Sequence, residues 1–281
     1  GRRAVQQLQR ELSGGGPLPR LTLATRMVDQ AILPGLIGFT RLGYRLGKHR
    51  WPLPCKALRG RTVVLTGGTS GIGRAAAFQL VRLGADLVLV GRNREKTEQV
   101  GRALRAAGGS GKVVIEIADL SLMADTRALA KRIVNRYPAV HVLINNAGVM
   151  VPPYSKTEDG FELQFGTNHL GHFALTGLLF DLLSKTADAR VVNVSSNGHR
   201  FGKMEFDDLM YEENKYSSIG AYARSKLANL LFTYELQRRF EPQDLDLIAV
   251  YDTMIRKLEW HLVRSANAHD PQALQILQTI P

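Results

Sequence analysis

From residue 61 onward, short apolar runs alternate with helix-length segments, and this alternation restricts the chain to few folds. Six runs rich in β-branched residues are the strand candidates: Thr62–Leu65, Asp86–Val90, Val113–Ile117, His141–Ile144, Arg190–Val194 and Leu245–Val250. The helix candidates between them include Ile72–Leu83, Leu122–Arg136, Asn168–Leu183 and Ser217–Phe240. Such βαβ units pack as a parallel sheet with helices on both faces. The sequence therefore predicts a doubly wound α/β fold with a mostly parallel sheet of six strands.

The net positive charge of the chain is concentrated in the residues that precede this α/β region. Residues 1–61 carry 12 Lys and Arg against two acids, whereas the rest carries 25 against 23. We expect a basic extension over 1–60, a nearly neutral α/β domain over 61–254, and a tail over 255–281 with two helix candidates. The domain has no Arg/Lys stripe interleaved with aromatic residues, which argues against binding to nucleic acid.

Within the extension, residues 25–50 mix apolar and basic side chains. The segment suits an interfacial helix on an anionic membrane surface, or a helix packed on the outside of the domain. Its longest apolar stretch, Ala31–Phe39, has nine residues and is too short to span a bilayer. The single Cys55 excludes an internal disulfide and suits a reducing compartment. We expect a cytoplasmic protein or one peripheral on an intracellular membrane, and the opening Gly1 suits a processed chain or a fragment.

A glycine-rich turn joins the first strand candidate to the first helix candidate. It reads Thr66-Gly-Gly-Thr-Ser-Gly-Ile-Gly73. Glycine lets the backbone approach a pyrophosphate closely, and the following helix directs its N–H groups and positive dipole end toward the phosphates. The alternative is an ordinary glycine-rich loop, but the position between strand and helix favours a dinucleotide site of the Rossmann type. The candidate residues are Gly67, Ser70, Gly71, Ile72 and Gly73.

The end of the second strand bears on the choice between NAD and NADP. An acid at this point hydrogen-bonds the ribose 2′-hydroxyl, whereas a cation accommodates a 2′-phosphate. The chain reads Val90-Gly-Arg-Asn-Arg94, with no acid before Glu95. This pattern predicts NADP, with Arg92 as the phosphate partner. The alternative is that Arg92 and Arg94 only begin the next helix in solvent.

Tyr222 and Lys226 are candidates for proton transfer because residues four apart share one helix face. Near neutrality a tyrosine hydroxyl is a weak acid, and a nearby ammonium stabilises the phenolate form. This spacing is common on helix surfaces, but here it accompanies polar motifs at two strand ends, Asn145–Gly148 and Val194–Ser196. Open α/β sheets bind ligands at the carboxyl ends of their strands, so the motifs are expected to converge.

Together these motifs resemble the classical short-chain dehydrogenase/reductase family over residues 60–250. The chain is most similar to retinol-dehydrogenase-like members, through Asp159–Phe161, Phe165–Phe173, Asn193–Ser196 and Ser225–Phe232. The resemblance implies a Rossmann-fold oxidoreductase that moves a hydride between NADP and a hydrophobic alcohol or carbonyl, such as a retinoid, a steroid or a lipid aldehyde. It also implies a homodimer as the default assembly.

The resemblance implies a role for each candidate residue. Tyr222 would be the general acid and base and would also bind the cofactor, as would Lys226, which would hold the nicotinamide ribose. Ser196 would polarise the substrate oxygen, with Ser195 as the alternative. Asn168 would organise a water path to Lys226, its alternatives being a helix cap or a buried hydrogen-bonded amide. The further cofactor residues would be Asp119 and Leu120 beside the adenine, and Asn146, Ala147 and Gly148 along the cleft. No metal is expected, because His169, His172 and His199 lack a ligand spacing with carboxylates.

The C-terminal part departs from the family pattern. The usual Pro-Gly turn after the sixth strand is absent where the chain reads Tyr251–Met254, and no later run suits a seventh strand. The alternative function is therefore a nucleotide-binding, catalytically weak member, disabled by a divergent or truncated C-terminus. A third hypothesis, a basic adaptor at a membrane surface, would rest on residues 1–61 alone.

Overall fold

The computed structural model of the protein describes residues 58–240. Its elements are β1 (Thr62–Thr66), α4 (Gly71–Arg82), β2 (Asp86–Gly91), α5 (Arg94–Ala106), β3 (Val113–Ile117), α6 (Met123–Arg136), β4 (Val142–Asn145), α7 (Leu163–Phe165), η1 (Gly166–Leu170), α8 (Gly171–Leu178), α9 (Phe180–Lys185), β5 (Arg190–Asn193), η2 (Asn197–Phe201), η3 (Phe206–Asp208) and α10 (Ser218–Phe240). In this range no helix combines the length and the apolar character that a membrane span requires. The extension with its segment 25–50, the sixth strand candidate Leu245–Val250, the Tyr251–Met254 region and the tail lie outside the described residues.

The described strands form one parallel sheet in the order β3-β2-β1-β4-β5. β1 is central, and its Leu65 pairs with Leu89 of β2 on one side and Ile144 of β4 on the other. The strand order reverses between β1 and β4, so the loops that follow these two strands diverge and leave a crevice at the carboxyl edge. The predicted doubly wound α/β fold is confirmed, with five of the six expected strands inside the described range.

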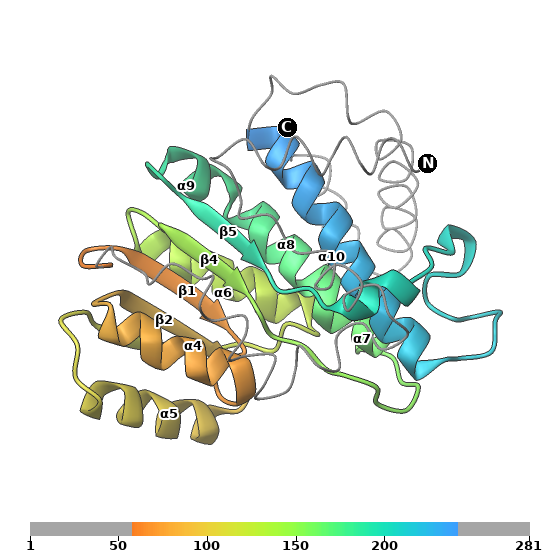
Figure 1. Ribbon diagram of the computed structural model, residues 1–281, viewed down its shortest axis with the longest axis horizontal. Coiled ribbons are helices and arrows are strands. Elements are labelled where there is room, and N and C mark those ends of the chain that lie inside the picture. Colours follow the sequence, from red (N-terminus) through yellow and green to blue (C-terminus); the bar gives the residue numbers. More distant parts are fainter. Residues whose placement is uncertain (1–57, 241–281) are drawn as a thin grey trace, which may run out of the picture. The chain divides into compact units, whose positions relative to one another are not determined.

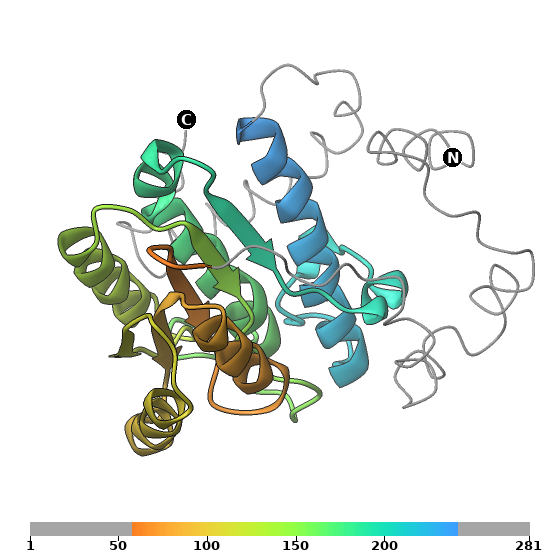
Figure 2. The ribbon, with the colours of Figure 1, turned by 60° about the vertical axis from the view of Figure 1, so that its left-hand side comes forward.

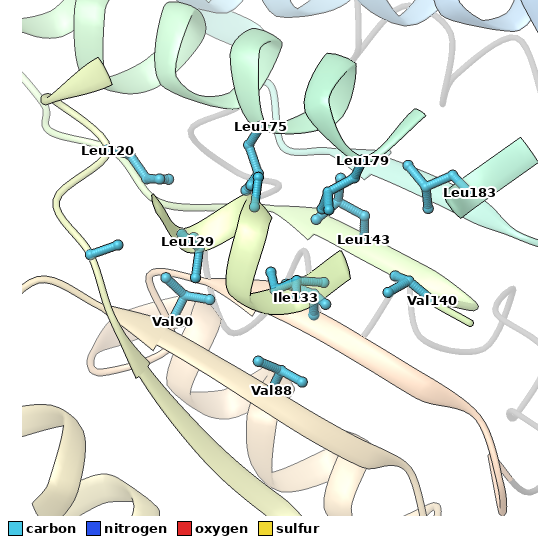
Figure 3. Close-up of a cluster of buried hydrophobic side chains, with 13 residues drawn as sticks. Val88, Val90, Leu120, Leu129, Ile133, Val140, Leu143, Leu175, Leu179 and Leu183 are labelled. Carbon is cyan, nitrogen blue, oxygen red and sulfur yellow. The ribbon is translucent and has the colours of Figure 1, made fainter. Parts of the chain in front are cut away.

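Helices cover both faces of the sheet, with α4 and α5 on one face and α8 and α10 on the other (Figure 1 and Figure 2). Neighbouring residues of β1 enter different clusters, because successive side chains of a strand point to opposite faces. Leu65 packs with residues of α4 and α5, whereas Val64 packs with Leu129, Leu143 and Leu175. Figure 3 shows this second cluster between the sheet, α6 and α8. Burial on both faces explains why the strands read as continuous apolar runs.

The predicted helix Asn168–Leu183 is confirmed as a helical segment, but it is not one regular α-helix. The chain forms instead the π-helical turn η1, then α8, and after a break at Leu179 the short α9. In η1 the backbone N–H of Gly171 bonds the carbonyl of Gly166, five residues back, so the turn holds one more residue than an α-helical turn. Inside the turn, the Asn168 carbonyl accepts hydrogen bonds from the side chains of His172 and Asn229. The bond from α10 is a tertiary contact that a local sequence pattern does not reveal.

Candidate nucleotide and catalytic site

A cleft of about 470 Å³ lies at the carboxyl edge of the sheet, over the ends of β1, β2, β3 and β4. It is lined by every predicted cofactor residue outside α10, namely Gly67, Ser70, Gly71, Ile72, Gly73, Arg92, Asp119, Leu120, Asn146, Ala147 and Gly148. Sequence reasoning missed further lining residues: Thr66, Thr69, Val90, Gly91, Ala118, Val149 and Thr167. Each of them lies beside a residue of one of the sequence motifs, and this proximity is the signal that could have identified them as lining residues.

The glycine-rich turn is shaped by close backbone contacts. Gly67 has a φ of +69°, and a Cβ built on it would lie 2.6 Å from the Cα of Ala147. A Cβ on Gly73 would collide with the Gly67 carbonyl and the Asn146 side chain, so only glycine fits there. Ser70 precedes α4 as its N-cap but makes no side-chain capping bond, which leaves the first N–H groups of α4 to an anion. This cradle fits the phosphates of a dinucleotide.

The two arginines after β2 have different surroundings. Arg94 begins α5 and forms an exposed ion pair with Glu98 at 3.5 Å, as expected of a solvated helix start. Arg92 lines the cleft. Among the described residues that line it, Arg92 is the single cation and Asp119 the single acid. The Asp119 carboxylate accepts the backbone N–H and the hydroxyl of Ser121 at 2.9 and 2.7 Å.

Lys226 and Tyr222 lie together on α10. The Lys226 Nζ is 5.7 Å from the centroid of the Tyr222 ring and donates to the Val194 carbonyl at 3.1 Å. Burial lowers the pKa of Lys226 to about 8. A Cβ built on Gly148 would lie 3.8 Å from this Nζ and 2.9 Å from the Asn168 Oδ1. The cleft loop after β4 therefore meets both Lys226 and Asn168.

The two serines after β5 differ in their hydrogen bonds. Ser195 Oγ donates to the Lys226 carbonyl at 2.8 Å, so its hydroxyl proton is already used in a hydrogen bond. Ser196 Oγ accepts the N–H of Gly198 at 3.1 Å, so its own proton is available to another acceptor. Gly198 lies between Ser196 and Tyr222, since a Cβ on it would be 3.4 Å from Ser196 Oγ and 3.5 Å from Tyr222 Cε1. This geometry favours Ser196 as the serine beside Tyr222.

Asn168 is completely buried and hydrogen-bonded through its side chain. Its Oδ1 accepts the Val149 N–H at 2.7 Å, and its Nδ2 donates to the Val149 carbonyl at 2.9 Å and to Ser225 Oγ at 3.1 Å. The helix-cap alternative is wrong, because Asn168 lies inside η1 and not at its end. As a buried hydrogen-bonded amide, it ties the loop after β4 to α10.

Comparison with known proteins agrees with this geometry. The sequence profile of a family described as short chain dehydrogenase matches residues 61–258. The chain belongs to this family. Retinol dehydrogenase 14 of Mus musculus is 44% identical over 209 residues, which cover 71% of this chain and 62% of the mouse protein. The resemblance to retinol-dehydrogenase-like members is thereby confirmed, and the chain spans less than two thirds of that relative's length.

Two solved structures support the same assignment. A protein from Mycobacterium paratuberculosis is 44% identical with a TM-score of 0.59, covering 66% of this chain and 64% of its own. A short chain dehydrogenase from Escherichia coli CFT073, complexed with NADPH, is 28% identical with a TM-score of 0.52, covering 67% of this chain and 75% of its own. The short-chain dehydrogenase fold therefore accounts for the described part of the chain.

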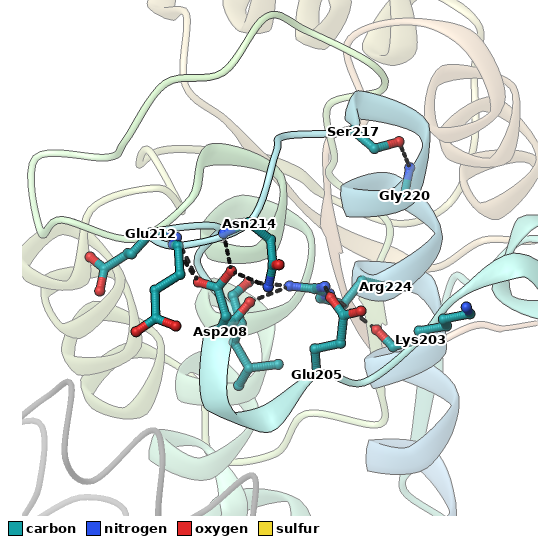
Figure 4. Close-up of polar contacts among 10 residues, drawn as sticks. Lys203, Glu205, Asp208, Glu212, Asn214, Ser217, Gly220 and Arg224 are labelled. Carbon is teal, nitrogen blue, oxygen red and sulfur yellow. Dashed lines mark hydrogen bonds and ion pairs between the residues drawn. The ribbon is translucent and has the colours of Figure 1, made fainter.

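Sequence reasoning also overlooked Arg224 of this short-chain dehydrogenase, which lies between Tyr222 and Lys226 in sequence and is 2% exposed. Residues two apart project to different sides of a helix, so Arg224 points away from the proposed proton-transfer pair. Its guanidinium pairs with Glu205 and donates to the carbonyls of Lys203, Asp208 and Leu209 at 3.1, 2.7 and 2.9 Å (Figure 4). It also lies 4.1 Å from the centroid of the Tyr211 ring. It thereby fastens the segment 203–211 to α10.

Arg224→Lys is expected to lower the free energy of unfolding by about 1–3 kcal/mol, because one ammonium cannot replace the planar fork that reaches three carbonyls. Urea unfolding of the full chain measures the change. Arg102→Lys, at an exposed position of α5, is the matched control. Equal stability of the two variants would contradict a fastening role for Arg224.

Proposed function

We propose that this chain binds NADP and transfers a hydride between the nicotinamide and a hydrophobic carbonyl or alcohol of the retinoid, steroid or lipid aldehyde class. The observation that carries the proposal is the junction at Gly148, where the cleft meets Asn168 and Lys226. The NADPH complex of the Escherichia coli relative supports the cofactor, and the similarity to retinol dehydrogenase 14 supports the substrate class.

The proposed reduction needs a proton as well as a hydride. When bound, a reduced nicotinamide supplies the hydride to the carbonyl carbon. Tyr222 donates its phenolic proton to the carbonyl oxygen, which becomes the hydroxyl of the product. Ser196 donates a hydrogen bond to the same oxygen, and Lys226 stabilises the phenolate left on Tyr222 while it holds the ribose. In oxidation each of these transfers runs in reverse, and positioning of the groups supplies much of the rate.

Arg92→Glu is expected to reverse the cofactor preference. In the unchanged chain NADPH should raise the unfolding temperature more than NADH does, because a ligand that binds only the folded state stabilises it. Replacing the cation by an acid removes a charge-assisted contact, so NADPH should bind at least about tenfold more weakly while NADH binds as well or better. Thermal unfolding at several nucleotide concentrations gives both affinities.

Arg94→Glu is the control for this experiment, since Arg94 is exposed and pairs with Glu98 on the helix. It reverses the same charge two residues away and should leave the ratio of the two affinities near that of the unchanged chain. An unchanged ratio in Arg92→Glu would contradict the assignment of the 2′-phosphate to Arg92.

A turnover assay separates the proposal from the alternative of a catalytically weak, nucleotide-binding member. NADPH consumption is followed with retinal and with a long-chain aldehyde as substrates. Binding of NADPH without consumption would support the alternative. The homodimer and the contact of residues 25–50 with a membrane surface stay predictions from the sequence.

A further inference from the structure

His172 of α8 is 1% exposed. It contacts two parts of the candidate site: Thr66, beside the nucleotide cleft, and the π-helical turn that holds Asn168. Its Nδ1 lies 3.1 Å from the Asn168 carbonyl, and its Nε2 lies 2.9 Å from the Thr66 hydroxyl. A carbonyl oxygen only accepts hydrogen bonds, so Nδ1 carries the proton. Burial lowers the pKa of His172 to about 4, so the ring is neutral near pH 7 and Nε2 is an acceptor. The Thr66 hydroxyl is therefore the donor to Nε2.

Thr66 connects this bond to the nucleotide cleft. It is completely buried at the end of β1, and its Oγ1 accepts the backbone N–H groups of Asn146 and Ala147, both at 3.0 Å. Both of these residues line the cleft. The competing acceptor for the Thr66 proton, the Ile144 carbonyl, is farther away at 3.2 Å. His172 is thus placed to orient the Thr66 hydroxyl, whose oxygen accepts two backbone N–H groups of the loop after β4.

The other ring nitrogen acts on the π-helical turn. The Asn168 carbonyl accepts from His172 on one side and from Asn229 Nδ2, at 3.0 Å, on the other. Asn229 is itself oriented by His169, whose Nδ1 lies 3.0 Å from the Asn229 Oδ1. The carbonyl is therefore fixed from α8 and α10 together, and this fixes the turn from which the Asn168 side chain reaches Val149.

We propose that His172 is a positioning residue that joins the nucleotide loop to Asn168, each ring nitrogen serving a different half of the site. The Nε2 half would hold Thr66 and the cofactor loop, and the Nδ1 half would hold the Asn168 turn. The inference rests on the proposed function, because the Asn168 half affects a rate only if the chain transfers a proton. The competing interpretation is a buried histidine that only packs α8 against the sheet.

Two substitutions separate the halves, because asparagine places its amide near the position of Nδ1 and glutamine reaches that of Nε2. His172→Asn keeps a donor for the Asn168 carbonyl and loses the acceptor for Thr66. It should weaken NADPH binding about tenfold and keep kcat at saturating NADPH within about twofold. His172→Gln keeps the acceptor and loses the donor, so kcat should fall about tenfold with the NADPH Kd within about twofold.

Thr186→Val is the control, because Thr186 is also buried and its hydroxyl bonds only the Leu182 carbonyl and the Val140 N–H among the described residues, at the opposite edge of the sheet from the cleft. This substitution should lower the free energy of unfolding, and it should not change the NADPH Kd and kcat by different factors. Two results would overturn the proposal: losses of NADPH affinity and of kcat that are equal in both His172 variants, or no change of either quantity in both variants.

Nitrogen-15 NMR of the histidines in the unchanged full chain gives a readout that needs neither variant to fold. The expected result is an Nδ1–H tautomer at His172 that persists at mildly acidic pH. An Nε2–H tautomer or a charged ring would overturn the proposal whatever the activity. If the chain binds no NADPH and consumes none, the proposed function fails, while the tautomer still tests the hydrogen-bond arrangement.

Discussion

Tyr222→Phe is expected to lower kcat for a hydrophobic aldehyde by about 10²–10⁴-fold, the usual contribution of a positioned proton donor. The phenyl ring keeps its place beside Lys226, so NADPH should bind with unchanged affinity. Steady-state turnover and nucleotide titration of the same preparation measure the two quantities. A kcat close to that of the unchanged chain would remove Tyr222 as the proton donor.

Tyr216→Phe is the control for this substitution. The Tyr216 hydroxyl donates to Glu162 at 3.0 Å and accepts from Gln164 at 2.9 Å, and Tyr216 is not among the residues that line the cleft. Removing that hydroxyl should lower stability by about 1 kcal/mol and leave most of the turnover. The contrast separates loss of a phenol hydroxyl at the proposed site from loss of a half-buried hydrogen bond elsewhere.

Lys226→Met is expected to abolish turnover and yet to stabilise the chain in the absence of nucleotide. Burial lowers the pKa of Lys226 from 10.5 to about 8, so at pH 7 the fold holds an ammonium that it disfavours by up to about 3 kcal/mol. Methionine has a similar length and no charge, so it removes this penalty. Urea unfolding at pH 7 should show a gain of about 1–3 kcal/mol, and a loss would contradict the expectation.

The pKa of Lys226 also predicts how the difference in unfolding free energy between the unchanged chain and Lys226→Met changes with pH. The folded-state pKa of Lys226, about 8, lies below the unfolded value of 10.5, so between them the unfolded chain binds more protons. The stability of the unchanged chain should therefore rise relative to Lys226→Met from pH 8 to pH 10.5 and differ by a constant amount below pH 8. Other alkaline groups cancel in the comparison, and a constant difference over the whole range would contradict the burial argument.

The parts of the fold that local signals specify could be predicted from the sequence. Strands such as Asp86–Gly91 are buried on both faces, so they read as apolar runs, and the glycines of the turn mark where the backbone must approach a ligand. The π-helical turn could not be predicted in this way, because its Asn168 carbonyl is held by Asn229, 61 residues later. Arg224 was missed for the same reason, since its hydrogen-bonding partners lie 15–21 residues before it in a segment without a regular pattern.

The cleft and the proposed chemistry occupy consecutive stretches of the chain. Within the described range, the residues that line the cleft run from Thr66 to Thr167, and the proposed proton-transfer residues follow from Asn168 to Lys226. The proposed determinants of cofactor preference and of turnover thus lie one after the other along the chain. An exchange of residues 61–167 with a relative should transplant the nucleotide preference as a block, provided that the incoming block supplies a hydroxyl for His172 to hold.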